Sequence, residues 1–330
     1  MQSQAIFFTG KQQVELMPVE LPGPKPNEVV VKAVCSLIST GTEGTCFNRA
    51  FGPTSTHNEW VKYPFATGYC WVGQVIEIGS DVTKFKVGDR VASRQQHASH
   101  HVLDQNDVIP IPDGVSSEDA VWFALAKIAA VGANAAEYRF GSKVAIIGAG
   151  PIGQMSTRWA AASLAQHVIV IDPVAKRLEM ATKGGATAVI DKPIVDAIPV
   201  VEEMLGSLPD IVIDSTGNAQ VFVQAQQLPR KFGKLVLLGS AGDPTQQHLT
   251  PAVMRNGLTI RGVHDIHNDD QWNNHTYSQF YFELLQRGRF NVDKLIWHRF
   301  KPVECQHVYT FMSEHRADTM GLLFDWGEMS

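Results

Sequence analysis

The chain lacks most of the features that mark membrane, secreted and nucleic-acid-binding proteins. It has four scattered cysteines (Cys35, Cys46, Cys70, Cys305) and no Cys-x-x-Cys pair, which argues against a disulfide framework or zinc knuckle and favours buried thiols. No apolar run approaches the roughly 18 residues of a membrane span. The net charge is −5 without a basic block, so we expect neither nucleic-acid nor membrane partners. The first residues lack a secretory signal, and we therefore expect a cytoplasmic protein.

The composition fits a globular enzyme with two domains. Apolar residues make up 44% of the 330 residues and charged residues 18%, a balance that supports folded cores rather than disorder. Residues 1–115 read as β-rich, with short strands at 14–16, 28–34, 73–78 and 89–92 that are broken by proline and glycine. Residues 107–112, which contain two prolines, predict an extended linker.

From residue 116 the pattern changes to alternating helices and strands. Ser116 begins a predicted helix, and the alanine-rich residues 120–136 predict a buried one. Strands are expected at 143–147, 168–171, 188–190, 211–213, 235–238 and 258–262, which predicts a doubly wound parallel sheet. After residue 265 an amphipathic helix over 278–287 precedes a strand-rich tail ending at 322–326. We expect a β-rich domain of residues 1–115 and 265–330, with an α/β domain of residues 116–264 inserted in it.

A glycine motif between two of these strands predicts dinucleotide binding. The strand 143–147 leads into Gly148-Ala-Gly-Pro-Ile-Gly153, a helix follows over 154–165, and the next strand ends in Asp172 about 20 residues after the second glycine. Gly148 permits a tight turn, Gly150 lets the backbone approach a pyrophosphate, and Gly153 lets the helix pack on the strand. The free N–H groups at the helix start would face the phosphates. Asp172 would accept hydrogen bonds from the adenosine ribose, which favours NAD, with NADP as the alternative because Lys176 and Arg177 lie close by.

With these motifs the chain resembles the medium-chain dehydrogenase/reductase superfamily over nearly its full length. The resemblance is carried by residues 68–79, 85–91, 148–153, 171–173, 183–186, 214–217 and 239. It implies a Rossmann domain inserted in a GroES-like catalytic domain, an oxidoreductase that moves a hydride between NAD(P) and an alcohol or ketone, and a homodimer. Its implied cofactor-binding residues are Gly148, Gly150, Pro151, Ile152, Gly153, Asp172, Arg177, Ser215, Thr216, Gly239 and Ser240.

Within the superfamily the chain is similar to a zinc-free branch. Residues 37–43, with Gly68 and Tyr69, resemble bacteriochlorophyllide hydroxyethyl dehydrogenase and the dehydrogenase half of two-domain saccharide-biosynthesis oxidoreductases. The three positions that hold catalytic zinc in other members are occupied here by Thr40, Tyr69 and Leu125, none of which is a usual zinc ligand. The cysteine-rich lobe of a structural zinc is also missing. We expect no metal, although His57, His97, His100 and His101 offer an alternative ligand cluster.

Without zinc, side chains must move the proton that accompanies hydride transfer. The candidates are Tyr69, which replaces a zinc ligand, Lys127, the only charge in the run 121–136, and Thr42, which aligns with the family's proton-relaying hydroxyl. A desolvated lysine can have its pKa lowered toward neutrality. Lys127 could equally be a helix residue whose ammonium reaches solvent, and Tyr69 a buried phenol. Glu43 is expected to orient its loop.

Two polar stretches, residues 48–63 and 264–277, are expected to contact the substrate. The candidate contacts are Thr40, His57, Trp60, His101 and His264. Their polarity favours a sugar, cyclitol or other polyhydroxylated metabolite. Two alternatives remain, a dehydrogenase of a large hydrophobic alcohol such as a chlorin side chain, and a non-catalytic dinucleotide-binding sensor or partner protein. The alternating strand 258–262 would lie at a sheet edge, where pairing across a twofold axis gives the expected homodimer.

Overall fold

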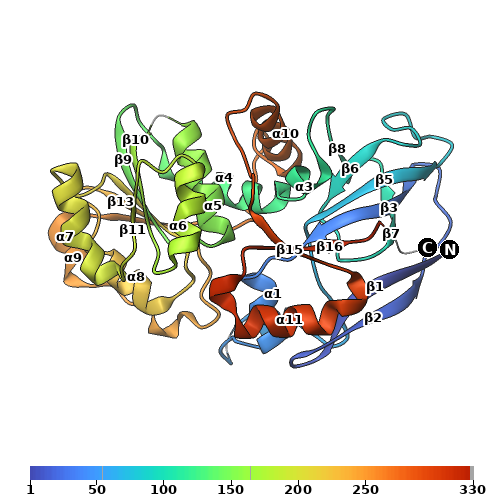
Figure 1. Ribbon diagram of the computed structural model, residues 1–330, viewed down its shortest axis with the longest axis horizontal. Helices are drawn as coiled ribbons and strands as arrows, with labels where there is room; N and C mark the ends of the chain where they lie inside the picture. The colour runs from blue at the N-terminus through green and yellow to red at the C-terminus, as the bar shows by residue number, and fades with distance from the viewer. Residues whose placement is uncertain (54, 164, 328–330) are drawn as a thin grey trace. The chain divides into compact units, whose positions relative to one another are not determined.

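The computed structural model describes residues 1–53, 55–163 and 165–327 and divides them into two compact units (Figure 1). Unit 1 comprises residues 1–124, 278–286 and 292–327, and unit 2 comprises Leu125–Tyr277 and Arg287–Asn291. The domains expected from the sequence, residues 1–115 with 265–330 and residues 116–264, stay a prediction, and the compact units change at residues 124 and 277. Among the helices of the described residues, none is long and apolar enough to cross a membrane.

Unit 1 is built on two β-sheets. The smaller has the order β2-β1-β4, with β1 at Gln2–Gly10, β2 at Gln13–Glu20 and β4 at Phe65–Ala66. The larger has the order β15-β16-β3-β5-β6-β8, and β7 also pairs with β3. Its strands are β3 (Glu28–Leu37), β5 (Trp71–Ile78), β6 (Arg90–Ser93), β7 (His100–Asp104), β8 (Ile109–Pro110), β15 (Ile296–Phe300) and β16 (Gly321–Asp325). Because β16 pairs antiparallel with β3, a strand near the C-terminal end of the chain joins the same sheet as residues 28–37.

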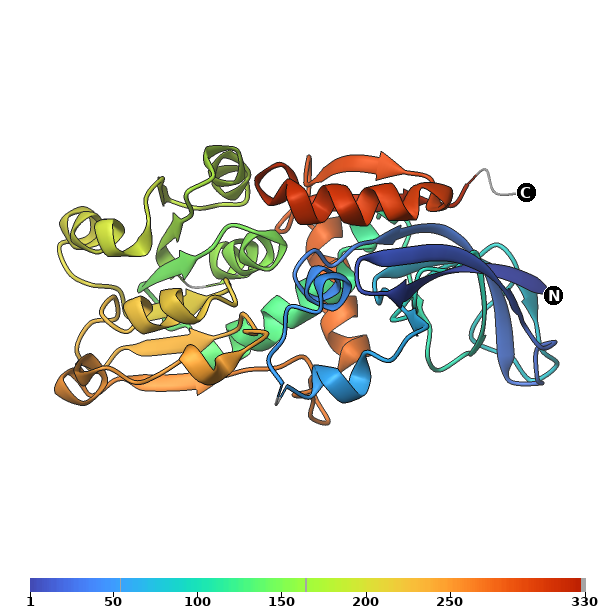
Figure 2. The same cartoon turned by 90° about the horizontal axis from the view of Figure 1, so that it is seen from below.

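Helices of unit 1 pack around its sheets. They are α1 (Thr42–Asn48), α2 (His57–Trp60), α3 (Ser117–Ala120) and α11 (Cys305–Glu314), and α10 (Asn274–Gln286) lies mostly in this unit. Helix α11 lies beside β2 (Figure 2) and places Tyr309 in a core with Phe8, Phe47 and Trp326. The helix start predicted at Ser116 is confirmed, because the Ser116 hydroxyl accepts a hydrogen bond from the backbone N–H of Asp119.

Unit 2 is a six-stranded parallel sheet in the order β11-β10-β9-β12-β13-β14, which is the order of a dinucleotide-binding Rossmann sheet. The strands are β9 (Ser142–Ile147), β10 (Ala165–Ile171), β11 (Ala188–Ile190), β12 (Ile211–Asp214), β13 (Lys234–Leu237) and β14 (Thr259–Gly262). Successive residues of β9 face opposite layers, so Val144 and Ile146 pack in one core cluster and Ala145 and Ile147 in another. All six strands were predicted within three residues of these bounds, and the predicted fold class is confirmed.

Helices cover both faces of this sheet. Residues of α4 (Phe123–Ala136), α5 (Pro151–Ala162) and α6 (Ala175–Lys183) pack on one face, and residues of α7 (Ile194–Leu205) and α8 (Ala219–Ala225) on the other. The short α9 (Pro251–Asn256) precedes β14. Helix α5 begins three residues earlier than predicted, because Pro151 occupies its first turn with a φ already suited to a helix. Leu164, inside the predicted helix, lies outside the described residues.

Candidate active site

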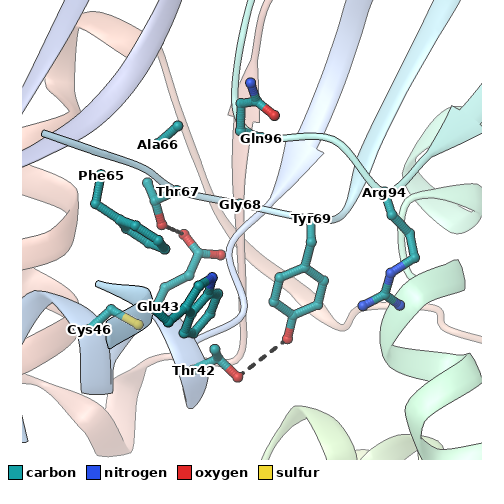
Figure 3. Close-up of a pocket in the computed structure, with 11 residues that line it drawn as sticks. Thr42, Glu43, Cys46, Phe65, Ala66, Thr67, Gly68, Tyr69, Arg94 and Gln96 are labelled. Atoms are coloured by element: carbon teal, nitrogen blue, oxygen red, sulfur yellow. Dashed lines mark hydrogen bonds between the residues drawn. The ribbon is translucent and has the colours of Figure 1, made fainter. Parts of the chain in front are cut away.

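Unit 1 contains a pocket of about 170 Å³ next to the start of α1 (Figure 3). The chain leaves β3 at Leu37, turns at residues 39–41 and enters α1, so the first residues of this helix face the pocket. Gly68 has a φ of +104°, and an added Cβ would lie 2.7 Å from the His97 ring, so glycine is required where the chain turns toward Tyr69. The lining residues are Thr42, Glu43, Cys46, Trp60, Phe65, Ala66, Thr67, Gly68, Tyr69, Arg94 and Gln96.

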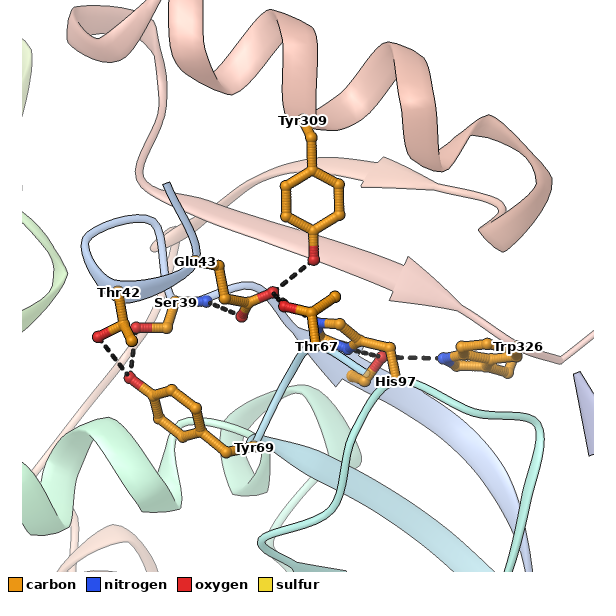
Figure 4. A network of polar contacts seen from close by, with 9 residues as sticks. Ser39, Thr42, Glu43, Thr67, Tyr69, His97, Tyr309 and Trp326 are labelled. Atoms are coloured by element: carbon orange, nitrogen blue, oxygen red, sulfur yellow. Dashed lines mark hydrogen bonds and ion pairs between the residues drawn. The ribbon is translucent and has the colours of Figure 1, made fainter. Parts of the chain in front are cut away.

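A buried carboxylate lies behind this pocket (Figure 4). Glu43, only 3% exposed, accepts hydrogen bonds from the Ser39 backbone N–H at 2.7 Å and from the Thr67 hydroxyl at 2.9 Å. It also contacts His97 Nε2 at 3.1 Å and accepts a hydrogen bond from the Tyr309 hydroxyl. These groups replace the water that a carboxylate loses on burial. The expectation that Glu43 orients its loop agrees with the bond from Ser39.

The network continues from His97 to the tail of the chain. The Trp326 indole N–H donates to Ser36 Oγ at 2.9 Å, and Ser36 Oγ lies 2.8 Å from His97 Nδ1. An indole can only donate, so the Ser36 proton is available to His97 Nδ1, which directs the Nε2 proton toward Glu43. His97 therefore supports Glu43 from within the fold, and sequence reasoning, which saw it as a strand residue or a metal ligand, missed this role.

The electrostatics of this network favour an ionised Glu43. Burial alone would raise the pKa of Glu43, but the contacts with His97, Tyr309 and the Ser39 N–H outweigh burial and lower it. Burial and the nearby Glu43 charge raise the pKa of Tyr309, so its hydroxyl stays a donor. Glu43 is thus a fixed charge that holds the residues lining the pocket.

Two of the three predicted catalytic residues meet in the pocket. The Tyr69 hydroxyl donates a short hydrogen bond to Ser39 Oγ and lies 3.5 Å from Thr42 Oγ1. Burial raises the pKa of Tyr69, which keeps its phenol protonated at neutral pH. Ser39 was not predicted, since a serine in a turn carries no distinguishing sequence signal. The three side chains form a connected set of hydroxyl groups, of which Tyr69 and Thr42 line the pocket and Ser39 is buried behind them.

The third candidate, Lys127, belongs to unit 2. Its side chain is 2% exposed, and its ammonium lies 2.9 Å from the Asp265 carboxylate and also bonds the Asp265 carbonyl oxygen. A buried lysine needs such a partner, because desolvating an unpaired charge is costly. The pair ties α4 to the start of the polar stretch 264–277.

The predicted substrate contacts occupy different surroundings. Trp60 lines the pocket, and His57 lies beside it, stacked on Phe51 and bonded to Ser55 Oγ at 3.0 Å. Thr40 lines a second, smaller cavity with Arg316. His101 is buried against Trp71 and bonds the Gln96 carbonyl, and burial lowers the pKa of His101 to about 4. It does not line the pocket, because alternation along β7 turns it into the core. His264 is exposed in unit 2.

The residues at the three family zinc-ligand positions are not usual zinc ligands. Thr40 offers a hydroxyl, Tyr69 a protonated phenol and Leu125 no donor atom, whereas zinc prefers thiolate, imidazole and carboxylate. Burial raises the pKa of the Cys46 thiol to about 12, and Glu43 is already occupied by four donors. Across the described residues, no three His, Cys, Asp or Glu side chains are placed to hold a metal ion. Of the histidines considered as an alternative cluster, His97 lies in the buried network, His101 is buried against Trp71, and His57 and His100 are half-buried.

In unit 2 the glycine motif forms the tight turn expected between β9 and α5. Gly148 has a φ of +91°, and Gly150 caps the helix. A Cβ on Gly153 would lie 1.9 Å from the Gly148 carbonyl oxygen, so the close packing of helix and turn requires glycine there. A Cβ on Gly150, in contrast, would meet nothing within 4 Å. Gly150 therefore leaves open space at the helix N-terminus, where a phosphate would be stabilised.

The other predicted cofactor residues surround this turn. The Asp172 carboxylate accepts hydrogen bonds from the Ala149 N–H at 2.7 Å and the Val174 N–H at 2.8 Å, and lies 4.0 Å from Arg177. It thus holds the glycine turn against the chain leading to α6, a role that was not predicted. Ser215 Oγ donates to the Gly148 carbonyl oxygen at 3.1 Å. Thr216, Gly239 and Ser240 lie at the carboxyl ends of β12 and β13, where ligands bind in such sheets.

The chain thus combines a unit with the fold and glycine turn of a dinucleotide-binding domain and a β-rich unit with a pocket lined by Thr42 and Tyr69. Residues 25–122 match the family model described as an alcohol dehydrogenase GroES-like domain, and residues 151–284 match the model described as a zinc-binding dehydrogenase. The chain belongs to the medium-chain dehydrogenase/reductase superfamily and is an oxidoreductase of the alcohol dehydrogenase type.

Individual relatives agree with this assignment. L-threonine 3-dehydrogenase of Caldanaerobacter subterraneus is 28% identical over 296 residues, which cover 79% of this chain and 83% of that protein. An Escherichia coli oxidoreductase/dehydrogenase of unknown specificity has the same fold, with a TM-score of 0.85, 22% identity and coverage of 98% of this chain and 99% of that chain. A zinc-binding dehydrogenase from Sinorhizobium meliloti, solved with NADP, has a TM-score of 0.81, 20% identity and the same coverage.

The Glu43 network generates a prediction about stability and pH. Glu43→Gln should lower the free energy of unfolding by about 3 kcal/mol at pH 7, because an amide cannot satisfy the donors that surround the carboxylate. The folded-state pKa of Glu43 lies below its unfolded value, so the stability it contributes is present above the unfolded pKa and is lost as the pH falls through the folded pKa. Urea denaturation should therefore show a gap between variant and wild type that narrows below about pH 4.

The control is Glu59→Gln, which removes an exposed carboxylate of α2 and should change the unfolding free energy by less than about 0.5 kcal/mol. A Glu43→Gln deficit of equal size at pH 3 and pH 7 would contradict the assigned role of the charge.

The geometry of the glycine turn predicts different effects for two alanine variants, one on stability and one on NADH binding. Gly153→Ala should lower the unfolding free energy by about 1–3 kcal/mol, because its methyl group meets the Gly148 carbonyl. Gly150→Ala should fold with nearly the wild-type melting temperature, but its methyl group would occupy the space next to a bound pyrophosphate. Calorimetry and NADH fluorescence titration measure the two effects. Wild-type NADH affinity in Gly150→Ala would argue against this binding mode.

Proposed function

We propose that the protein is a zinc-independent, NAD-dependent oxidoreductase that interconverts an alcohol and a ketone in a small polyhydroxylated metabolite, such as a sugar or cyclitol. The observation that carries this proposal is the set of hydroxyl groups of Tyr69, Ser39 and Thr42, with Tyr69 at a family zinc-ligand position. The polar lining of the pocket and its volume of about 170 Å³ support a small hydroxylated substrate over a chlorin. We place the protein in the cytoplasm.

The proton chemistry follows from this arrangement. A bound nicotinamide supplies the hydride for reduction or accepts it in oxidation. In reduction, the carbonyl carbon gains the hydride and the carbonyl oxygen gains a proton, which Tyr69 donates as a general acid. The phenol oxygen then regains a proton through Ser39 and Thr42, each of which passes on its hydroxyl proton and takes up another, with water as the final source. Thr42 also donates a hydrogen bond to the developing oxyanion, the task that zinc performs in other members of the family.

NAD is favoured over NADP by Asp172. Both carboxylate oxygens already accept one backbone hydrogen bond, and each retains a lone pair for a ribose hydroxyl. A 2′-phosphate would bring negative charge beside this carboxylate. Arg177, 4.0 Å from Asp172, reduces the repulsion without removing it.

The test combines turnover with metal content. We expect the purified protein to oxidise NADH in the presence of polyhydroxylated ketones, with far less than one zinc per chain by elemental analysis and with activity unchanged by chelators. Preference for NADPH by tenfold, about 1.4 kcal/mol, would overturn the role of Asp172. Stoichiometric zinc would overturn zinc independence, and absence of turnover across the panel would favour a non-catalytic dinucleotide-binding protein.

Variants then identify the proton donor. Tyr69→Phe keeps the ring and should lower kcat by about 10²–10⁴ with little change in NADH affinity. Thr42→Val should lower kcat by a smaller factor, since a water molecule can replace the threonine hydroxyl as a proton relay. The competing proton donor is Lys127. Lys127→Met tests it, because this variant removes the only charge of α4 and the ammonium group that pairs with Asp265. If Lys127→Met rather than Tyr69→Phe loses the rate while both retain wild-type melting temperatures, Lys127 is the donor.

A homodimer through the unit 2 sheet is also proposed. β14 is an edge strand, and the exposed Phe232 and Met254 lie on the segments that precede it. Pairing two copies of β14 about a twofold axis would satisfy the open edge and cover these side chains. Light scattering at micromolar concentration should give twice the chain mass, and a monomer would contradict the proposal.

A further inference from the structure

Trp60 exposes a large aromatic surface at the wall of the unit 1 pocket. It is the last residue of α2, lines the pocket and is 52% exposed. Its ring meets the Phe65 ring at 84° with a centroid distance of 5.2 Å, and the His57 ring at 66° with a centroid distance of 5.6 Å. These edge-to-face contacts restrict the indole. An apolar surface of this size, held in place at a pocket wall, indicates a ligand contact.

The indole belongs to an apolar side of the pocket that is anchored in the core of unit 1. Phe65 also lines the pocket and belongs to β4, which pairs with β1. The Phe65 ring stacks on the buried Phe8 at a centroid distance of 6.2 Å. Because Trp60 packs on Phe65, the two side chains form one fixed apolar surface, which we call the aromatic wall.

The hydroxyl groups of the pocket lie on a different side. Figure 3 shows the Phe65 ring on one side of the pocket and the hydroxyl groups of Thr42 and Tyr69 on another. A ligand in this pocket therefore meets an apolar surface and a hydrogen-bonding surface at the same time.

A hydroxylated ring in the chair form matches both surfaces. When its hydroxyl groups are equatorial, they project from the rim of the ring, and the two faces of the ring carry only C–H bonds. An open-chain polyol has no lasting apolar face, because its C–H and O–H groups alternate around a flexible backbone. Ordering that backbone in a pocket also costs conformational entropy, which a ring does not lose.

We propose that Trp60 selects a ring-shaped substrate, a cyclitol or a pyranose with mostly equatorial hydroxyl groups. One C–H face of the ring packs on the indole, and a carbon at the rim reacts beside Tyr69. The packing removes apolar area from water and brings C–H bonds against the electron-rich face of the indole. The inference rests on the proposed function and narrows its substrate class from polyhydroxylated metabolites to hydroxylated rings.

The experiment compares three ketones that separate the ring from its hydroxyl groups. The first is scyllo-inosose, a cyclohexane ring with one ketone and all hydroxyl groups equatorial. L-Erythrulose is a hydroxylated ketone that stays in the open-chain form, and cyclohexanone is the ring without hydroxyl groups. The readout is kcat/KM for NADH-dependent reduction. We expect scyllo-inosose to exceed each of the other two by about tenfold or more. A rate constant for either comparison ketone that equals or exceeds that of scyllo-inosose would overturn the inference.

Variants assign the selectivity to Trp60. Trp60→Ala should reduce the ratio of kcat/KM for scyllo-inosose to that for erythrulose to near one, mainly through KM, because it removes the aromatic face. Trp60→Phe should retain part of the ratio, since it keeps a smaller aromatic face. Phe140→Ala is the matched control, because it removes an aromatic side chain that is 92% exposed and lies outside the pocket. A ratio in Trp60→Ala that equals the wild-type ratio would contradict the assignment.

Failure of the proposed function has a different signature, namely no reduction of any of the three ketones. In that case saturation-transfer NMR on the NADH-treated protein compares scyllo-inositol with the open-chain alcohol erythritol. A scyllo-inositol signal that exceeds the erythritol signal and is lost in Trp60→Ala supports the ring site without turnover. Equal signals from the two alcohols, a scyllo-inositol signal that Trp60→Ala retains, or no signal from either alcohol overturns it.

Discussion

Burying a carboxylate costs several kcal/mol unless donors replace its water, and unit 1 meets this requirement at Glu43 with groups from distant parts of the chain. The Ser39 N–H comes from the turn after β3, Thr67 follows β4, His97 follows β6, and Tyr309 comes from α11. Each donor can reach Glu43 only when its segment is in place. The pocket wall formed by α1 and residues 67–69 is therefore positioned by the same contacts that hold the sheets and α11 together.

In unit 2 the predicted cofactor-binding residues are positioned by the parallel sheet. Strands that run in one direction bring their carboxyl ends to a common edge, and the order of the six strands leaves an opening at the ends of β9 and β12. The glycine turn, Asp172 and Ser215 lie there because they directly follow strands, not because of long-range side-chain contacts. The hydrogen bond from the Ala149 N–H to the Asp172 carboxylate then holds the turn in a conformation that leaves free space next to Gly150.

This contrast explains what could be predicted. Strands of unit 2, the glycine turn and Asp172 follow from local periodicity and from one compact motif, and their positions were predicted to within a few residues. The links of Glu43 to Tyr309 and of Ser36 to Trp326 join residues more than 250 positions apart, and no local pattern signals them.

The contact of Trp326 with Ser36 also bears on how the protein is made. The strands of unit 2 lie in one continuous stretch between residues 142 and 262, so its sheet can assemble while later residues are still being synthesised. In unit 1, β3 pairs with β16, and the Ser36 hydroxyl meets its indole donor only after residue 326 has left the ribosome. During translation unit 1 therefore lacks β16 in its larger sheet and the Trp326 donor to Ser36 until synthesis ends. We expect chaperones to act on this unit during that time.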